Sequence, residues 1–176
     1  MNPDDDTSAA AVAAWIAALE QDGDWIDLPV TAAELVGEDR ATRVVTAVVL
    51  DASAGAEIVV RTTVGRRLLA LVPQDRTWWV PDHFHLEAAG AIRRMLLRKL
   101  IDEQRAASAL DRLLSLPVVV ARSHPLIAEA WTFRANLIVH DALYVVLARI
   151  LDAPLLTGDR KMAGAPHLPV SVLHLS

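Results

Sequence analysis

Four acidic residues in this sequence each fall beside a segment with the pattern of a buried strand or a helix start. They are Asp51, Glu87, Asp141 and Asp159. A carboxylate beside an apolar strand is costly to bury unless it is solvated, paired or bound to a metal. Four such groups without matching cations favour Mg²⁺, which takes oxygen ligands, with Mn²⁺ as the alternative ion. Such an ion could activate water and stabilise charge on a phosphodiester, so the sequence predicts hydrolysis of a nucleic-acid backbone.

Each acid also has a purely structural interpretation. Asp51 and Asp141 could cap the helices that follow them. Asp159 could serve only a turn, and Glu87 could lie on a solvated helix face or pair with a nearby arginine. The joint placement of the four, rather than any one of them, favours a site.

Strands and helices must alternate along the chain to position these acids. Strands are expected at 46–50, 78–80, 117–121, 154–158 and 169–175, and helices after Asp51 and at 84–100, 102–116, 124–134 and 140–151. Continuous apolar strands between helices indicate an α/β fold, in which helices cover a mostly parallel sheet. Ligands bind outside the carboxyl ends of the strands in such sheets. The four acids are therefore expected at one edge of the sheet.

The composition is that of a compact globular protein, with 53% apolar and 22% charged residues. The chain has no cysteine, which excludes disulfides, thiol catalysis and thiolate zinc sites. The charge is divided along the chain. Residues 1–43 hold ten acidic and two basic residues, a net charge of −8, whereas the remainder holds 15 basic and 12 acidic residues, a net charge of +3. The acidic segment could cover a surface that attracts an anion, or it could only aid solubility.

Four segments resemble the sequence motifs of PIN-domain ribonucleases. They are 48–54 with Asp51 and Ser53, 80–87 ending in Glu87, 140–148 with Asp141, and 155–162 with Thr157 and Asp159. The chain is most similar to VapC-type toxins of bacterial toxin–antitoxin pairs, over residues 44–176. This resemblance implies a PIN-like three-layer α/β/α fold and a Mg²⁺-dependent endoribonuclease. It also implies a homodimer that cleaves structured RNA, such as transfer or ribosomal RNA.

The resemblance assigns roles to the acids and to two hydroxyl residues. The acids that would bind the metal are Asp51, Asp141 and Asp159. Glu87 would complete the site directly or through water. Ser53 and Thr157 would orient carboxylates and water by hydrogen bonds.

Basic side chains near the acids are candidates for binding RNA phosphates. They are Arg93, Arg94, Arg98 and Lys99 after Glu87, and Arg160 and Lys161 after Asp159. A solvated helix face is the simpler interpretation of the first group. Trp78 and Trp79 could stack on bases, or belong to the core or to a dimer interface. His83 and His85 have no matching ligand set, so we do not expect them to bind metal.

Residues 1–43 lie outside the PIN resemblance and are interpreted as an acidic helical arm. Helices are expected at 9–19 and 31–39. Trp15 and Trp25 need another surface, because a segment this short cannot bury them by itself.

The arm resembles the C-terminal tails of VapB-type antitoxins, which wrap their toxins. This resemblance implies inhibition of the nuclease, with Arg40 or Arg43 reaching the carboxylates. The partner of the nuclease would then be either an antitoxin or its own arm. The short link before the first strand favours docking on a neighbouring subunit of a dimer.

Two other functions remain open from the sequence. The chain could be a catalytically silent PIN-like binding module or scaffold, or a nuclease acting on DNA flaps. The second alternative lacks an evident duplex-binding module. No basic stretch precedes an apolar segment near Met1, and no apolar run is long enough to span a bilayer. We therefore expect a cytoplasmic protein without a membrane partner.

Overall fold

The computed structural model describes residues 9–21, 47–73 and 76–175. The strands in these residues form one parallel sheet. They are β1 (Ala47–Leu50), β2 (Thr77–Pro81), β3 (Val118–Ala121), β4 (Leu155–Leu156) and β5 (Val172–Leu173), in the order β3-β2-β1-β4-β5. β1 is central, pairing Val48 with Trp78 of β2 and Leu50 with Leu156 of β4. The parallel α/β fold predicted from the sequence is therefore confirmed.

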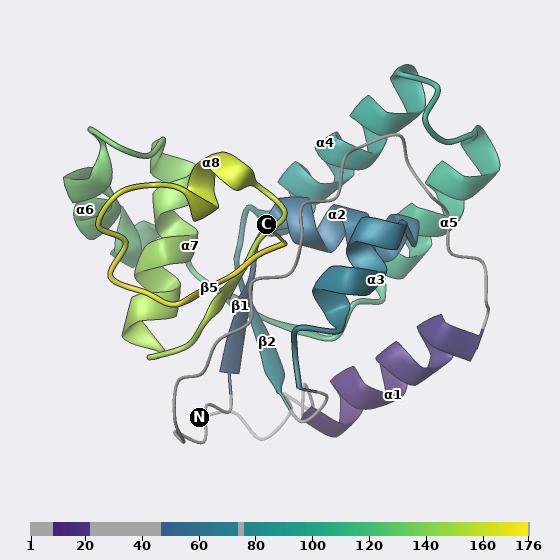
Figure 1. The fold of residues 1–176 in the computed structure, drawn as a ribbon, viewed down its shortest axis with the longest axis horizontal. Helices are drawn as coiled ribbons and strands as arrows, with labels where there is room; N and C mark the ends of the chain where they lie inside the picture. The colour runs from purple at the N-terminus through teal and green to yellow at the C-terminus, as the bar shows by residue number, and fades with distance from the viewer. Residues whose placement is uncertain (1–8, 22–46, 74–75, 176) are drawn as a thin grey trace.

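Helices cover both faces of this sheet. They are α1 (Ala9–Gln21), α2 (Ala52–Val60), α3 (Thr63–Leu69), α4 (Phe84–Leu97), α5 (Glu103–Leu114), α6 (Ile127–Ala130), α7 (Val139–Ile150) and α8 (Arg160–Ala163). Figure 1 shows α6 and α7 on one side of the sheet and α2 to α5 on the other. Within the described ranges, no helix has both the length and the apolar character needed to cross a membrane.

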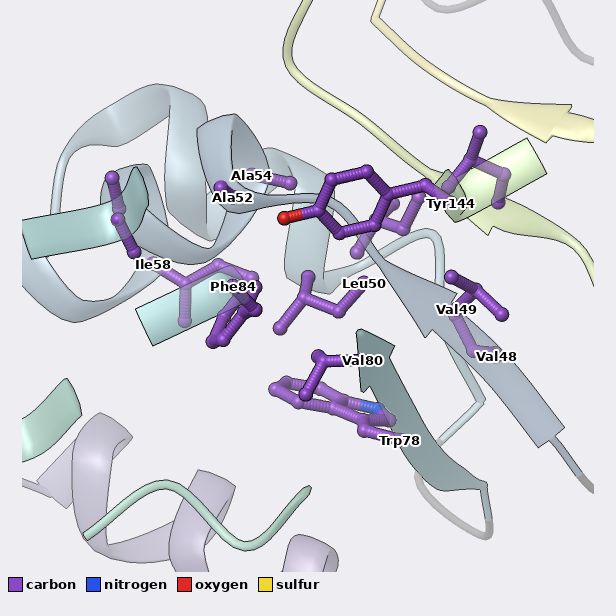
Figure 2. Packing of buried hydrophobic residues seen from close by; sticks show 14 of the residues in the cluster. Val48, Val49, Leu50, Ala52, Ala54, Ile58, Trp78, Val80, Phe84 and Tyr144 are labelled. Atoms are coloured by element: carbon purple, nitrogen blue, oxygen red, sulfur yellow. The ribbon is translucent and has the colours of Figure 1, made fainter. Parts of the chain in front are cut away.

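The core forms where α2 and α4 press on β1 and β2. Val48, Val49 and Leu50 are all buried, because both faces of a parallel strand are covered by helices. A Cβ atom at Gly55 of α2 would lie 2.6 Å from the ring of Phe84, so the two helices approach closely at this glycine. Figure 2 shows this ring packed between α2 and Leu50.

Two elements differ from the sequence expectation. The helical stretch after Asp51 is interrupted at Arg61, which takes a left-handed conformation with φ of 64°, and Thr62 then caps the separate helix α3. The segment expected to be one helix from 124 to 134 consists of the short helix α6 between 3₁₀ turns at His124–Leu126 and Trp131–Phe133. The break at Arg61 carries neither Gly nor Pro, so the sequence pattern gave no signal for it. Pro125, at the centre of the first 3₁₀ turn, was interpreted instead as an early residue of one longer helix.

α1 packs on the body of its own chain and confirms the helix expected at 9–19. Val12, Ile16 and Leu19 are buried in the common core. The ring of Trp15 meets that of Trp78 edge-on, with 6.2 Å between centroids. Because Trp78 is fully buried, the base-stacking role considered for it is wrong.

Several expectations about the arm fall outside the described residues. They concern Trp25, the helix at 31–39, Arg40, Arg43 and the boundary between residues 43 and 44.

Candidate active site

The strand order creates a switch point between β1 and β4, where the chain changes from one half of the sheet to the other. Ligand sites in parallel sheets form at such points, beyond the carboxyl ends of the strands. Asp51 follows β1 directly, and Thr157 follows β4. The Asp51 amide donates to the Leu156 carbonyl at 2.9 Å, so Asp51 and Thr157 leave neighbouring strands side by side.

Asp51 is nearly buried, with 4% of its surface exposed. It caps α2 by accepting a hydrogen bond from the Ser53 amide, so the capping interpretation holds together with its place at the sheet edge. The hydroxyls of Ser53 and Thr157 also donate to Oδ2, the latter at 2.8 Å. None of these three donors acts on Oδ1. Burial raises the pKa of Asp51; these hydrogen bonds oppose the rise, and the charge of Glu87 adds to it.

The turn after β4 is tied to α2 by the same hydroxyls. Ser53 Oγ accepts from the Gly158 amide at 2.9 Å, and Thr157 Oγ1 accepts from the Asp159 amide at 3.0 Å. Asp159 in turn caps α8, accepting from the Lys161 amide at 2.7 Å. Ser53 and Thr157 therefore hold Asp159 in place as well as Asp51.

Glu87 lies in the first turn of α4 and is held by aromatic side chains. The hydroxyl of Tyr144 donates to Oε2 at 2.8 Å, and His83 Nε2 lies 3.4 Å from the same oxygen. His140 Nε2 lies 3.3 Å from Oε1. Burial, followed by the charge of Glu87, raises the pKa of Tyr144, so the hydroxyl keeps its proton and remains a donor. Figure 2 shows Tyr144 reaching from α7 across the end of β1.

Asp141 lies in the first turn of α7, three residues after the cap position, so it is not the helix cap. Burial raises its pKa to about 6, and His140, 3.7 Å away, opposes the rise. The charges that add to the rise are those of Asp51, Glu87 and Asp159. Asp141 thus lies close enough to the other three predicted acids for their charges to act on it.

A donor set suited to a cation lies within this group. Glu87, His140 and Asp141 each offer a ligand atom, and these atoms lie within 4.8 Å of one another. Carboxylate oxygens are the donors that Mg²⁺ and Mn²⁺ take in proteins. Burial and then the neighbouring acids raise the pKa of Asp141, and a divalent cation would offset both, so these residues fit such an ion.

Three residues beside the acids were not predicted from the sequence to belong to the site. Tyr144 lies one turn after Asp141 on α7, and His83 lies one turn before Glu87, so helical spacing could have pointed to both. His140 directly precedes Asp141 and carried no spacing signal of its own. His85, considered together with His83, instead packs its ring against Phe84, with 5.2 Å between centroids.

The predicted basic residues lie on α4, which contains Glu87, and on α8, which follows Asp159. Arg93 and Arg94 are exposed on α4, about two turns beyond Glu87. Arg160 and Lys161 are exposed in the first turn of α8, directly after Asp159.

Comparisons with known proteins agree with this architecture. A family model described as the PIN domain matches residues 49–171. Ribonuclease VapC1 of Mycobacterium tuberculosis is 42% identical over 96 residues, covering 52% of this chain and 70% of that protein. Ribonuclease VapC12 of the same organism is 35% identical over 116 residues, covering 66% of this chain and 89% of that protein.

A solved structure shares the fold. The crystal structure of VapBC2 from Rickettsia felis, bound to a DNA fragment from its promoter, aligns with a TM-score of 0.51 at 16% identity, over 74% of this chain and 99% of that one. This likeness concerns the fold alone. Because the family model spans well over half of the sequence and includes all four acids, the chain belongs to the PIN-domain family.

Proposed function

We propose that this chain is a metal-dependent endoribonuclease, the toxin component of a toxin–antitoxin pair. The observation that carries the proposal is the convergence of four acids at the switch point of the sheet. The relatives named ribonucleases support RNA as the substrate. We propose further, from the resemblance of the sequence motifs alone, that the substrate is a structured RNA, such as transfer or ribosomal RNA.

Some side chains of the site are proposed to bind the cation, and others to orient the carboxylates that bind it. The residues proposed to bind the cation are Asp51, Asp141 and Asp159, with Glu87 completing the site directly or through water. A bound Mg²⁺ or Mn²⁺ would lower the pKa of a water and stabilise charge on the phosphodiester. Ser53 and Thr157 fix Oδ2 of Asp51, and Tyr144 fixes Oε2 of Glu87, so each carboxylate keeps one oxygen in a defined direction.

The basic side chains would position the RNA backbone on either side of the acids. Arg93 and Arg94 approach from α4, and Arg160 and Lys161 from α8. Contacts to phosphates fix the register of a nucleic acid without reading its sequence. Their loss should therefore weaken binding to all RNAs alike.

A cleavage assay with matched variants tests the activity. Transfer and ribosomal RNA are incubated with the full chain in Mg²⁺, in Mn²⁺ and in EDTA, and with Asp51→Asn and Asp111→Asn, the latter at an exposed side chain of α5. We expect cleavage that EDTA abolishes, that Asp51→Asn loses and that Asp111→Asn retains. A folded chain without cleavage in either metal would favour the silent binding module, and cleavage that survives Asp51→Asn would refute this site.

We propose further that the chain consists of an inhibitory arm, residues 1–43, and a nuclease domain, residues 44–176. α1 is bound at one end of α2, where the Arg61 side chain donates to the Leu19 carbonyl. Asp51 caps the other end of α2, nine residues or about 13 Å away. Figure 1 shows α1 on the opposite side of the molecule from α7 and α8. α1 would therefore anchor the arm rather than cover the acids.

Residues 22–46 connect α1 to β1 and include Arg40 and Arg43. Arg40 lies seven positions before Ala47, a span of at most about 23 Å, whereas Asp51 lies about 13 Å from Ala47 at the other end of β1. Inhibition within one chain and exchange between two subunits of a dimer both fit these distances. A guanidinium can pair with carboxylates where a metal would bind.

Substitution of the two arginines tests the arm without removing α1. Arg40→Ala combined with Arg43→Ala should raise the rate of RNA cleavage, whereas the exposed Arg122→Ala should not. An unchanged rate in the double variant would refute inhibition by these side chains. A homodimer is also proposed, and light scattering on the purified chain measures it.

A further inference from the structure

We propose that His140 is a nitrogen ligand of the bound cation, and that the site therefore prefers Mn²⁺ to Mg²⁺. The inference depends on the proposed function only for the presence of a cation among the carboxylates. It adds a residue that lies outside the set of four acids.

The geometry places the imidazole among the donors. Nε2 of His140 lies 3.3 Å from Oε1 of Glu87 and 3.7 Å from Oδ1 of Asp141. Neighbouring ligands of an octahedral ion with bonds of about 2.1 Å lie about 3.0 Å apart. The two contacts of His140 are close to this spacing, and all three ligand atoms lie within 4.8 Å of one another, so movement of the side chains would let one cation contact all of them.

The two carboxylate oxygens of Glu87 have different neighbours, and this difference leaves Oε1 facing His140. Oε2 accepts a hydrogen bond from the Tyr144 hydroxyl and lies beside Nε2 of His83. His83 also contacts Ser123 through its other ring nitrogen, with 3.2 Å between Nδ1 and Oγ, so its ring is engaged from both sides. Oε1 remains as the oxygen for a cation, and His140 is the imidazole beside it.

The position of His140 suits a ligand better than a structural side chain. Its side chain is 51% exposed, so core packing does not require it. It directly precedes Asp141 in the first turn of α7, which keeps the two donors together. The competing interpretation is a protonated His140 that pairs with both carboxylates. In that case no nitrogen would bond to the metal.

A nitrogen ligand would change the choice of ion. Mg²⁺ is bound almost entirely by oxygen, whereas imidazole is a good ligand for transition metals. His140→Gln should therefore weaken Mn²⁺ binding about tenfold, the scale on which metal sites respond to loss of a supporting group. Mg²⁺ binding should change much less, so the ratio of the two affinities should fall.

Electron spin-echo envelope modulation of Mn²⁺ bound to the full chain tests the bond itself. This spectrum detects a directly coordinated imidazole nitrogen without any assay of activity. The protein is compared with His140→Gln and with His85→Gln, whose ring packs on Phe84. Circular dichroism confirms that each variant is folded, and calorimetry gives the Mn²⁺ and Mg²⁺ affinities.

We expect a ¹⁴N modulation in the unaltered chain and in His85→Gln that disappears in His140→Gln, together with the selective loss of Mn²⁺ affinity. Bound Mn²⁺ without ¹⁴N modulation, or a modulation that survives His140→Gln, would overturn the role of His140 and leave the proposed metal site intact. A chain that binds no Mn²⁺ at all would overturn both.

Discussion

Hydroxyl groups donate to two carboxylates of this site, those of Asp51 and Glu87. Ser53 and Thr157 donate to Asp51, and Tyr144 donates to Glu87. A neutral donor fixes a carboxylate oxygen but leaves its negative charge in place, whereas an arginine or lysine would neutralise it. The local negative charge is therefore available to a divalent ion.

Tyr144→Phe tests how much one such donor contributes to the rate of RNA cleavage. The ring would keep its packing, but Glu87 would lose the hydrogen bond at 2.8 Å. We expect the cleavage rate to fall about 10- to 100-fold, the usual effect of removing a group that orients a metal ligand. Rates at saturating Mg²⁺ measure this effect, and Thr132→Val, on an exposed turn, serves as the control. An unchanged rate in Tyr144→Phe would show that Glu87 needs no fixed orientation.

The pKa of Asp141 predicts how stability and metal binding depend on pH. In the metal-free protein this pKa is raised from 3.8 to about 6, so the folded state binds the proton more tightly than the unfolded state does. The stabilisation is complete below about pH 4 and is lost as the pH rises to about 6. It amounts to at most about 3 kcal/mol.

Metal must displace this proton, so the apparent affinity for Mg²⁺ should increase as the pH rises through about 6. Thermal melts from pH 4 to 8, with and without Mg²⁺, measure both trends. Asp141→Asn should flatten the metal-free profile. A wild-type profile as flat as that of the variant would contradict the assignment.

At the scale of elements, the backbones of α2 and α3 pack closely against each other where the two helices meet. Arg61 adopts φ of 64° between them, and Thr62 accepts a hydrogen bond from the Gly65 amide at 2.9 Å. A Cβ atom at Gly65 would lie 2.2 Å from the carbonyl oxygen of Glu57. This glycine is required by the close approach of two backbones.

Gly65→Ala should therefore lower the free energy of unfolding by about 1–3 kcal/mol, because the backbone of α2 or α3 must shift. Gly90→Ala is the matched control, since its Cβ would meet only the Arg94 side chain at 3.6 Å. In the middle of α4 that change should stabilise the protein by about 0.5–1 kcal/mol. Chemical denaturation of both variants measures the difference, and equal effects would contradict the predicted crowding.

Sequence patterns predicted the elements whose signals are local. The apolar run before Asp51 predicted β1, and the periodicity after Phe84 predicted α4. The expected strand at 154–158 is only two residues long, because Thr157 and Asp159 turn the chain through their own side-chain hydrogen bonds.

The partners of Glu87 could not be predicted in the same way. Its contacts with Tyr144 and His140 join residues more than 50 positions apart, and they exist only once α7 packs across the sheet. The sequence pattern located the acids, but the groups that orient them depend on tertiary packing.

At the scale of the whole molecule, α1 is part of the same core as the nuclease domain. Ile16 is 3% exposed and belongs to the cluster that includes Trp78. α1 should therefore unfold together with the rest of this core rather than independently.

Ile16→Ala tests this coupling. We expect a loss of about 2–4 kcal/mol in a single unfolding transition, the usual result of truncating a buried isoleucine. Ile150→Ala, at a side chain that is 54% exposed, should cost far less. A separate early transition for α1, or equal effects of the two variants, would mean that α1 is not integrated into the core.

Four acids from distant parts of the chain are proposed to build one metal site at the switch point of the sheet. Crystals of the protein grown with Mn²⁺ test it most directly, through anomalous scattering at the manganese edge. We expect a peak bounded by Asp51, Glu87, Asp141 and Asp159 that is absent from crystals of Asp141→Asn. A peak elsewhere, or acids that remain together without bound metal at saturating Mn²⁺, would contradict it.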